Sequence, residues 1–131
     1  MRRSLLLRSL AALGIILITC ATLVWWHMGF HTIEPNEVYG SPQLSPSDLK
    51  KKIKAHNIRA IINLRGTMPT SPWYQDEVRI ASEMNVSHCS VPLSSKYLPF
   101  RKEFCQVLEA LESSPKPVLI HCQSGIDRTG F

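Results

Sequence analysis

The sequence lacks the patterns that place a chain among zinc-binding, nucleotide-binding or nucleic-acid-binding proteins. Its four cysteines include no CxxC pair and their spacing matches no metal-binding pattern. No GxxxxGK[ST] segment occurs, which excludes a Walker A loop. The formal charge of +5 falls to +2 once Arg2, Arg3 and Arg8 are set aside. So small an excess does not indicate a nucleic-acid partner.

Internal repeats and low-complexity tracts are also absent. The chain has 131 residues, and once a membrane segment is subtracted, about a hundred remain for one small α/β domain. A second domain is therefore excluded. The run of lysines over 50–54 falls in a helical pattern, and we interpret it as a solvated face.

Residues 9–26 carry no charged side chain, and their length is about that needed to cross a hydrocarbon core. We expect a transmembrane anchor over 9–28 after a basic flank over 1–8, with Trp25 and Trp26 in an interfacial aromatic belt. A cleaved signal peptide and a lipoprotein at Cys20 are the alternatives. The apolar run is longer than a usual signal segment, and no small-residue cleavage site follows it.

The flanking charges predict how this single-pass anchor is oriented. Three arginines precede the span, and no Lys or Arg follows it until Lys50. The positive-inside bias places the N-terminus in the cytoplasm and the domain outside it, in the periplasm if the cell is Gram-negative.

Residues 37–131 show strand and helix patterns in alternation, after a linker over 29–36. Short apolar strands separated by helices are typical of a central, mostly parallel sheet with helices on both faces. Ser45 is expected to cap a helix with Pro46 at its first position. The expected strands are 37–39, 58–64, 86–93 and 118–120, and the expected helices 46–56, 73–84 and 100–112.

Helical spacing predicts which side chains of these helices are buried. Cys89 and Cys105 lie in a strand pattern and a helix pattern, and we expect both to be small buried residues. The expected buried positions on the helices are Leu49, Ile53, Tyr74, Val78, Ala81, Met84, Phe104, Val107, Leu108 and Leu111.

The chemistry is expected at the end of the chain, where a buried strand delivers Cys122 to its carboxyl end. If the next six residues wrap as a nest that leads into a helix, their N–H groups form a cradle for a tetrahedral dianion and lower the pKa of the thiol. Arg128 offers a planar fork for two phosphoryl oxygens. The expected phosphate-binding residues are Gln123, Ser124, Gly125, Ile126, Asp127 and Arg128.

Two neighbours of this loop have expected roles. Thr129 can donate its hydroxyl to the sulfur and help it leave from a phosphocysteine. His121 is expected to position the loop through its ring, because it precedes Cys122 on the strand and points the other way.

The segment HCQSGIDRTG over 121–130 resembles the HCxxGxxRTG signature of protein tyrosine and dual-specificity phosphatases. Upstream, Val38-Tyr39, Gln43-Leu44, IINLRG and PWYQDE resemble the compact bacterial dual-specificity-like branch. This resemblance implies a dual-specificity-like fold and dephosphorylation through a phosphoenzyme on Cys122, with no metal and no organic cofactor. It also implies helices beyond Phe131, so we expect the C-terminal part of the domain to be missing.

The sequence departs from the family pattern at the general acid, because residues 91–99 hold no carboxylate. Asp127 is the candidate donor, and a loop-structuring helix cap is its equally weighted alternative. Asp76 and Glu77 are the next candidates.

The expected substrates are phosphotyrosine, phosphoserine or phosphothreonine in proteins, or a phospholipid or inositol phosphate, with Lys96 and Arg101 beside the pocket. Two rival functions stay open. One is a pseudophosphatase that binds phosphate without turnover. The other is a rhodanese-like sulfurtransferase, against which Arg128 followed by Thr129-Gly130 argues.

Overall fold

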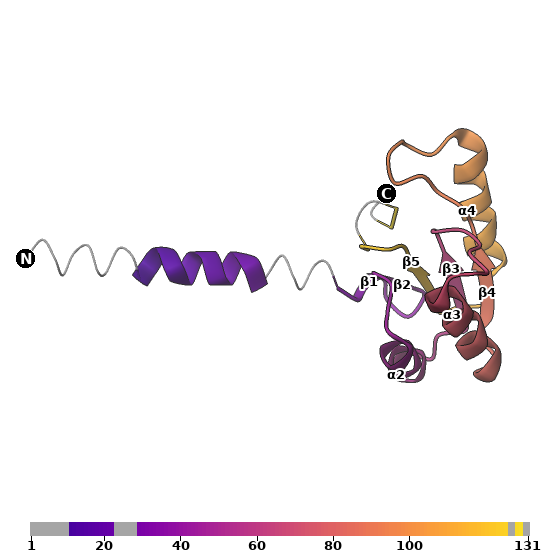
Figure 1. The fold of residues 1–131 in the computed structure, drawn as a ribbon, viewed down its shortest axis with the longest axis horizontal. Helices are drawn as coiled ribbons and strands as arrows, with labels where there is room; N and C mark the ends of the chain where they lie inside the picture. Colours follow the sequence, from indigo (N-terminus) through magenta and orange to yellow (C-terminus); the bar gives the residue numbers. More distant parts are fainter. Residues whose placement is uncertain (1–10, 23–28, 126–127, 130–131) are drawn as a thin grey trace, which may run out of the picture.

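The computed structural model describes residues 11–22, 29–125 and 128–129, which contain a five-stranded sheet in the order β1-β2-β5-β3-β4 (Figure 1). β1 pairs antiparallel with β2, and all other neighbours are parallel. This confirms a mostly parallel sheet with β3 and β5 as inner strands. The strands are β1 (His31–Glu34), β2 (Val38–Ser41), β3 (Ala60–Asn63), β4 (Ser87–Ser90) and β5 (Val118–His121).

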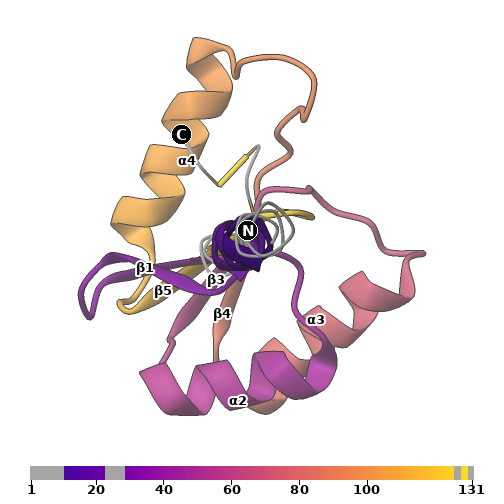
Figure 2. The ribbon, with the colours of Figure 1, turned by 90° about the vertical axis from the view of Figure 1, so that its left-hand side faces the viewer.

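Helices cover both faces of this sheet (Figure 2). α2 (Pro46–His56) and α3 (Pro72–Glu83) lie on one face, and α4 (Arg101–Ser113) lies on the other. Because side chains of a strand alternate between faces, β5 contributes Leu119 to the core under α2 and α3, and Ile120 to the core under α4. The α/β class and its layers are as predicted.

β1 corrects the expectation of a linker over 29–36. Its turn is made by Asn36, whose φ of 60° is a left-handed conformation that Asn tolerates. The Glu37 N–H donates to the Glu34 carbonyl at 3.1 Å and closes the hairpin. A strand of four residues is too short for alternation to reveal it in the sequence.

α2 begins and ends as its sequence predicts. The Ser45 hydroxyl accepts a hydrogen bond from the Asp48 N–H at 3.2 Å, and Asn57 ends the helix in a left-handed conformation. Leu49 and Ile53 are buried, as predicted.

The predicted faces of the other two helices are partly wrong. α3 buries Glu77, Ile80 and Ala81, and Val78 is exposed because the face that carries Glu77 turns toward the sheet. On α4 only Ala110 is buried, and Phe104 and Leu108 are exposed.

The two cysteines expected to be buried, Cys89 and Cys105, are exposed. Cys89 lies on β4, an edge strand that pairs only with β3, and Cys105 lies on a face of α4 that packs on no other described element. Neither environment could be deduced from the local sequence.

Residues 11–22 form a helix ahead of the sheet. Among the residues that the structure describes, no helix is both long and apolar enough to cross a membrane. The expected anchor over 9–28 also includes residues 9–10 and 23–28, which lie outside the described part of the chain, as does the basic flank over 1–8.

Candidate active site

The site forms where three parallel strands end together. β5 lies between β2 and β3, so the chain leaves it with both neighbours alongside. The Leu64 N–H donates to the His121 carbonyl at 2.9 Å, and the Gln43 N–H donates to the Gln123 carbonyl at 3.1 Å. These hydrogen bonds hold both sides of the segment that carries Cys122. Cys122 thus lies at the carboxyl end of β5, at the expected edge of the sheet.

The loop after Cys122 turns back over the sulfur. Gly125 has a φ of 77°, and a Cβ there would lie 2.7 Å from the Pro42 nitrogen. Only glycine meets both constraints without strain. Its N–H donates to the Cys122 Sγ at 3.1 Å. This glycine therefore turns a backbone donor toward the reactive atom.

The environment of the Cys122 thiol favours the thiolate. Its side chain is 1% exposed, and burial alone would raise the pKa of the thiol. The Thr129 hydroxyl and the N–H groups of Arg128, Gly125 and Ser124 outweigh burial, so the pKa of Cys122 lies below its ordinary value. This is the effect that the sequence predicted for a nest of donors.

Arg128 lies beside the same sulfur. Cys122 and Arg128 line a hollow of about 270 Å³ together with Ser95, Gln123 and Ser124. The Arg128 Nε is buried and has no hydrogen-bond partner among the described residues, an arrangement that a bound anion would complete. Lys96 and Arg101 do not line this hollow. Ile126 and Asp127 lie outside the described residues.

A buried polar network behind the site was missed by sequence reasoning. Glu77 of α3 is 3% exposed. The Gln43 Nε2 lies 2.8 Å from its Oε2, and the His88 Nε2 lies 2.9 Å from its Oε1. The His121 Nε2 lies 3.0 Å from Oε2, with the distance of an ion pair but not the angle of a hydrogen bond. One signal was available, because Glu77 lies three and four positions before the apolar residues Ile80 and Ala81.

The same network reaches Arg65, at the end of β3. The Arg65 Nη1 donates to the Gln43 Oε1 at 3.1 Å, and its guanidinium lies 3.7 Å from the centroid of the Trp73 ring. Burial and the charge of Arg128 lower the pKa of Arg65, while Glu77 and Cys122 raise it. A second guanidinium is therefore held by an amide and an aromatic ring, near enough for the charges of Arg128 and Cys122 to affect it.

The two carboxylates that the sequence offered as alternative acids do not suit that role. Burial opposes ionisation of Glu77, but His121, His88 and Gln43 lower its pKa to about 2. A group with that pKa is ionised near neutral pH and has no proton to donate. Asp76 contacts Arg79 at 2.6 Å on the exposed side of α3. Neither carboxylate lines the hollow at Cys122.

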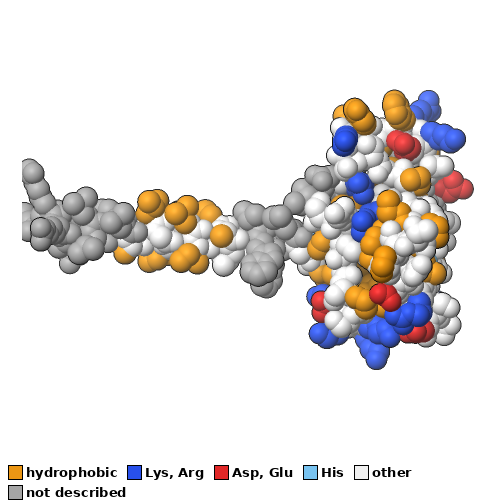
Figure 3. Space-filling view, in the orientation of Figure 1, with side chains coloured by type: hydrophobic (Ala, Val, Ile, Leu, Met, Phe, Trp, Pro, Cys, Tyr) orange, Lys and Arg blue, Asp and Glu red, His pale blue; other side chains and the backbone are white. Residues whose placement is uncertain are grey.

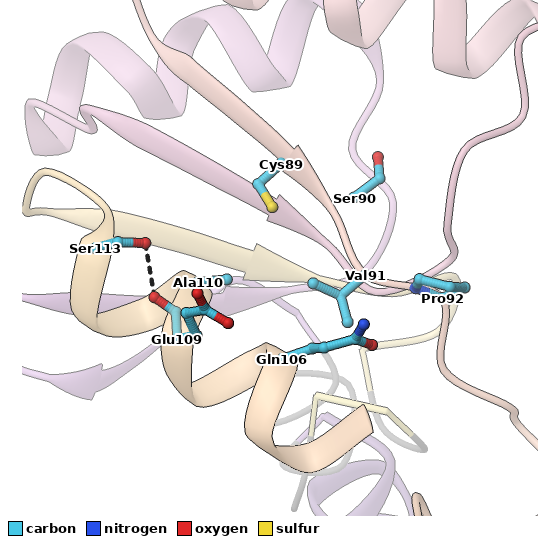
Figure 4. A pocket seen from close by; sticks show the side chains of 8 residues that line it. All are labelled: Cys89, Ser90, Val91, Pro92, Gln106, Glu109, Ala110 and Ser113. Atoms are coloured by element: carbon cyan, nitrogen blue, oxygen red, sulfur yellow. Dashed lines mark hydrogen bonds between the residues drawn. The ribbon is translucent and has the colours of Figure 1, made fainter. Parts of the chain in front are cut away.

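A second hollow, of about 310 Å³, lies between β4 and α4 (Figure 4). Cys89, Gln106 and Glu109 are among its lining residues, which include no Lys or Arg. A phosphate would meet the Glu109 carboxylate there and no positive charge, so this hollow does not suit an anion.

A parallel α/β sheet with a low-pKa cysteine at the end of an inner strand, and an arginine six positions later, defines the class of cysteine-dependent phosphatase domains. The chain belongs to the family described as "Polymorphic toxin system, DSP-PTPase phosphatase", whose sequence model matches residues 40–131. This confirms the dual-specificity-like resemblance of the HCQSGIDRTG segment.

Solved phosphatases share this fold. The core catalytic domain of the PP-IP phosphatase Siw14 from S. cerevisiae matches with 21% identity and a TM-score of 0.64, over 77% of this chain and 59% of that one. TpbA from P. aeruginosa matches with 18% identity and a TM-score of 0.56, over 79% and 64%. The chain spans 59% to 63% of the first three solved chains that it matches. A comparison with curated protein sequences found no match.

Proposed function

We propose that this chain hydrolyses phosphate monoesters through a phosphocysteine on Cys122. The observation that carries the proposal is the sulfur itself, which is buried, accepts the Gly125 N–H at 3.1 Å and has a lowered pKa. The thiolate attacks phosphorus and the bond to the leaving oxygen breaks. Water then attacks the phosphocysteine, which releases inorganic phosphate and restores the thiolate.

Arg128 and Thr129 complete this cycle in the proposal. The buried Nε of Arg128 has no hydrogen-bond partner among the described residues, and in the proposal the guanidinium binds two phosphoryl oxygens as the centre inverts. The buried Thr129 hydroxyl, which lowers the pKa of Cys122, would stabilise the sulfur as it departs in the second step.

We propose an aryl phosphate, phosphotyrosine, as the preferred substrate. Among the described residues, which do not include Asp127, no carboxylate lines the hollow at Cys122. A phenol departs with less help from a proton donor than an alkyl alcohol does. TpbA has been solved in complex with phosphotyrosine, whereas Siw14 is a PP-IP phosphatase. A phosphoinositide is therefore the comparison substrate.

The membrane anchor over 9–28 stays a proposal. The described helical residues expose large apolar side chains at positions 13 and 15–18, and Figure 3 shows apolar side chains along the visible side of this helix. A helix that is apolar all round needs an apolar surrounding. Cell fractionation with alkaline extraction, and protease access to the domain in intact cells, would test the anchor and the proposed extracytoplasmic side. Release of the intact chain by alkali would contradict the anchor.

Phosphate release by the purified chain, in detergent, tests the activity. Wild type should release phosphate from a phosphotyrosine peptide faster than from a short-chain phosphoinositide, and Cys122→Ser should abolish release while still binding the peptide. Cys105→Ser is the matched control, because this thiol is exposed on α4, and it should remain active. Binding of the peptide by wild type without release would favour the pseudophosphatase, and an active Cys122→Ser variant would exclude the cysteine mechanism.

A further inference from the structure

Glu77 lies behind the site and takes no part in the proposed phosphoryl transfer. It projects from α3 toward the sheet, between Ile80 and Ala81 of the buried face and the polar side chains of β4 and β5. Burial of a carboxylate is costly unless its partners satisfy it, and an apolar residue of similar volume is often as stable in such a place. Packing alone therefore gives no reason for a carboxylate at this position.

The partners of Glu77 explain it better. An ionised carboxylate only accepts hydrogen bonds, so the Gln43 and His88 nitrogens that bind it must each present an N–H, while the His121 nitrogen faces it at ion-pair distance. These nitrogens belong to His88 on β4, His121 on β5 and Gln43 in the segment after β2. One carboxylate thus connects three segments that are far apart in the sequence, two of which border the reactive loop.

Both contacts toward the loop lead to groups at the anion site. His121 directly precedes Cys122, and its other ring nitrogen, Nδ1, lies 3.4 Å from the Cys122 carbonyl oxygen. Gln43 binds the loop with its backbone, through the Gln123 carbonyl, and binds Arg65 with its side-chain oxygen. Glu77 therefore contacts the residue that precedes Cys122, and it reaches the Arg65 guanidinium through Gln43.

We propose that Glu77 is a positioning residue of the active site, which holds His121 and Gln43 so that the loop donors point at Cys122 and Arg65 stays bound to Gln43. The proposal rests on the proposed function only in naming the site that is positioned. Glu77 touches neither the sulfur nor the hollow, so its effect must pass through these partners.

Alkylation of Cys122 measures this effect without any turnover. Iodoacetamide labelling is followed as a function of pH, and the Cys122 peptide is quantified by mass spectrometry because the exposed Cys20, Cys89 and Cys105 are labelled too. In Glu77→Gln the midpoint of labelling should rise by about one pH unit, which is a tenfold slower reaction at a pH below both midpoints. Asp76→Asn is the matched control, since it removes one charge from the adjacent, part-exposed position, and it should match wild type.

A second pair of variants covers the case in which Glu77→Gln does not fold. His88→Leu removes the donor to Glu77 Oε1, while His88→Gln keeps an N–H at that place. His88→Leu should raise the labelling midpoint, as Glu77→Gln does. His88→Gln should bring the midpoint most of the way back to the wild-type value.

The proposal would be overturned if Glu77→Gln or His88→Leu lowered the melting temperature but gave the same labelling profile as wild type. Glu77 would then be a structural residue. Failure of the proposed function looks different. Wild type would then label at low pH and release no phosphate, while the comparison of the Glu77 variants would still be readable.

Discussion

At the scale of single residues, the shape of the loop after β5 is set by Gly125, and its chemistry by Cys122 and Arg128. Cys122 and Arg128 were identified from the sequence because a nucleophile, a glycine and an arginine at fixed spacing are hard to produce by packing. The orientation of the Gly125 N–H toward sulfur could not be derived, because it depends on Pro42, which packs against the loop from another segment.

Gly125→Ala should damage both the fold of the loop and the reactivity of the thiol. The added Cβ would lie 2.7 Å from the Pro42 nitrogen, and the alanine backbone would have to keep a φ of 77°. This backbone strain should lower the free energy of unfolding by about 1–3 kcal/mol. The displaced N–H would no longer stabilise the thiolate, so the pKa of Cys122 should rise. Thermal unfolding and iodoacetamide labelling measure the two effects. Gly14→Ala is the control, since nothing lies within 4 Å of a Cβ there.

Asp127→Asn tests the remaining candidate for the general acid. If Asp127 donates the proton to the leaving oxygen, the variant should lose on the order of a hundredfold in kcat with a phosphoserine peptide and much less with p-nitrophenyl phosphate, whose phenol needs no donor. An equal small loss on both substrates would identify Asp127 as a loop-structuring residue.

At the scale of elements, β5 shows how far sequence patterns extend. Its apolar run predicted a buried inner strand, and alternation predicted that His121 and Cys122 face opposite sides, as they do. The partner of His121 was not predictable, because Glu77 lies 44 positions earlier on α3, and helical spacing does not distinguish a buried carboxylate from a solvated one. The β1 hairpin was missed because its pairing with β2 is a tertiary feature.

Glu77 should make the stability of α3 on the sheet depend on pH. Its pKa in the folded chain is about 2, below the ordinary 4.5, so its contribution is complete above the ordinary pKa and is lost as pH falls from there toward the folded value. Wild type should melt higher than Glu77→Gln near neutral pH, and this gap should narrow below about pH 4.5. Melting curves of both chains across this range test it, and a gap that is independent of pH would contradict it.

At the scale of the whole molecule, the sheet keeps Cys89 and Cys122 apart. A disulfide between Cys122 and Cys89, which lies on β4, is ruled out by the strand pairing. Cys89 pairs with Ile62, which pairs in turn with Ile120. Two strand spacings of ~4.8 Å, and two further residues along the strand, place the two cysteine Cα atoms beyond the ~7 Å limit for a disulfide.

Peroxide should therefore oxidise Cys122 without forming a bridge to Cys89. Its lowered pKa favours reaction of the thiolate. Mass spectrometry should detect sulfenic and sulfinic acid on the Cys122 peptide, at the same rate in Cys89→Ser. A crosslinked peptide pair that contains both cysteines would show that the sheet opens enough to bring them together.

The antiparallel direction of β1 has a consequence for where the chain can act. His31 pairs with Gly40, and Gly40 pairs with Ile120, so the chain enters the sheet at the end from which β5 delivers Cys122. These positions are two strand spacings, or about 10 Å, apart. With residue 28, the last of the proposed anchor, at the bilayer surface, the two residues before His31 would span at most about 7 Å. The reactive sulfur would then stay within a thin layer above the lipid. Phosphorylated proteins anchored in the same membrane would meet it at a high effective concentration, whereas the anchor would not raise the effective concentration of freely diffusing substrates.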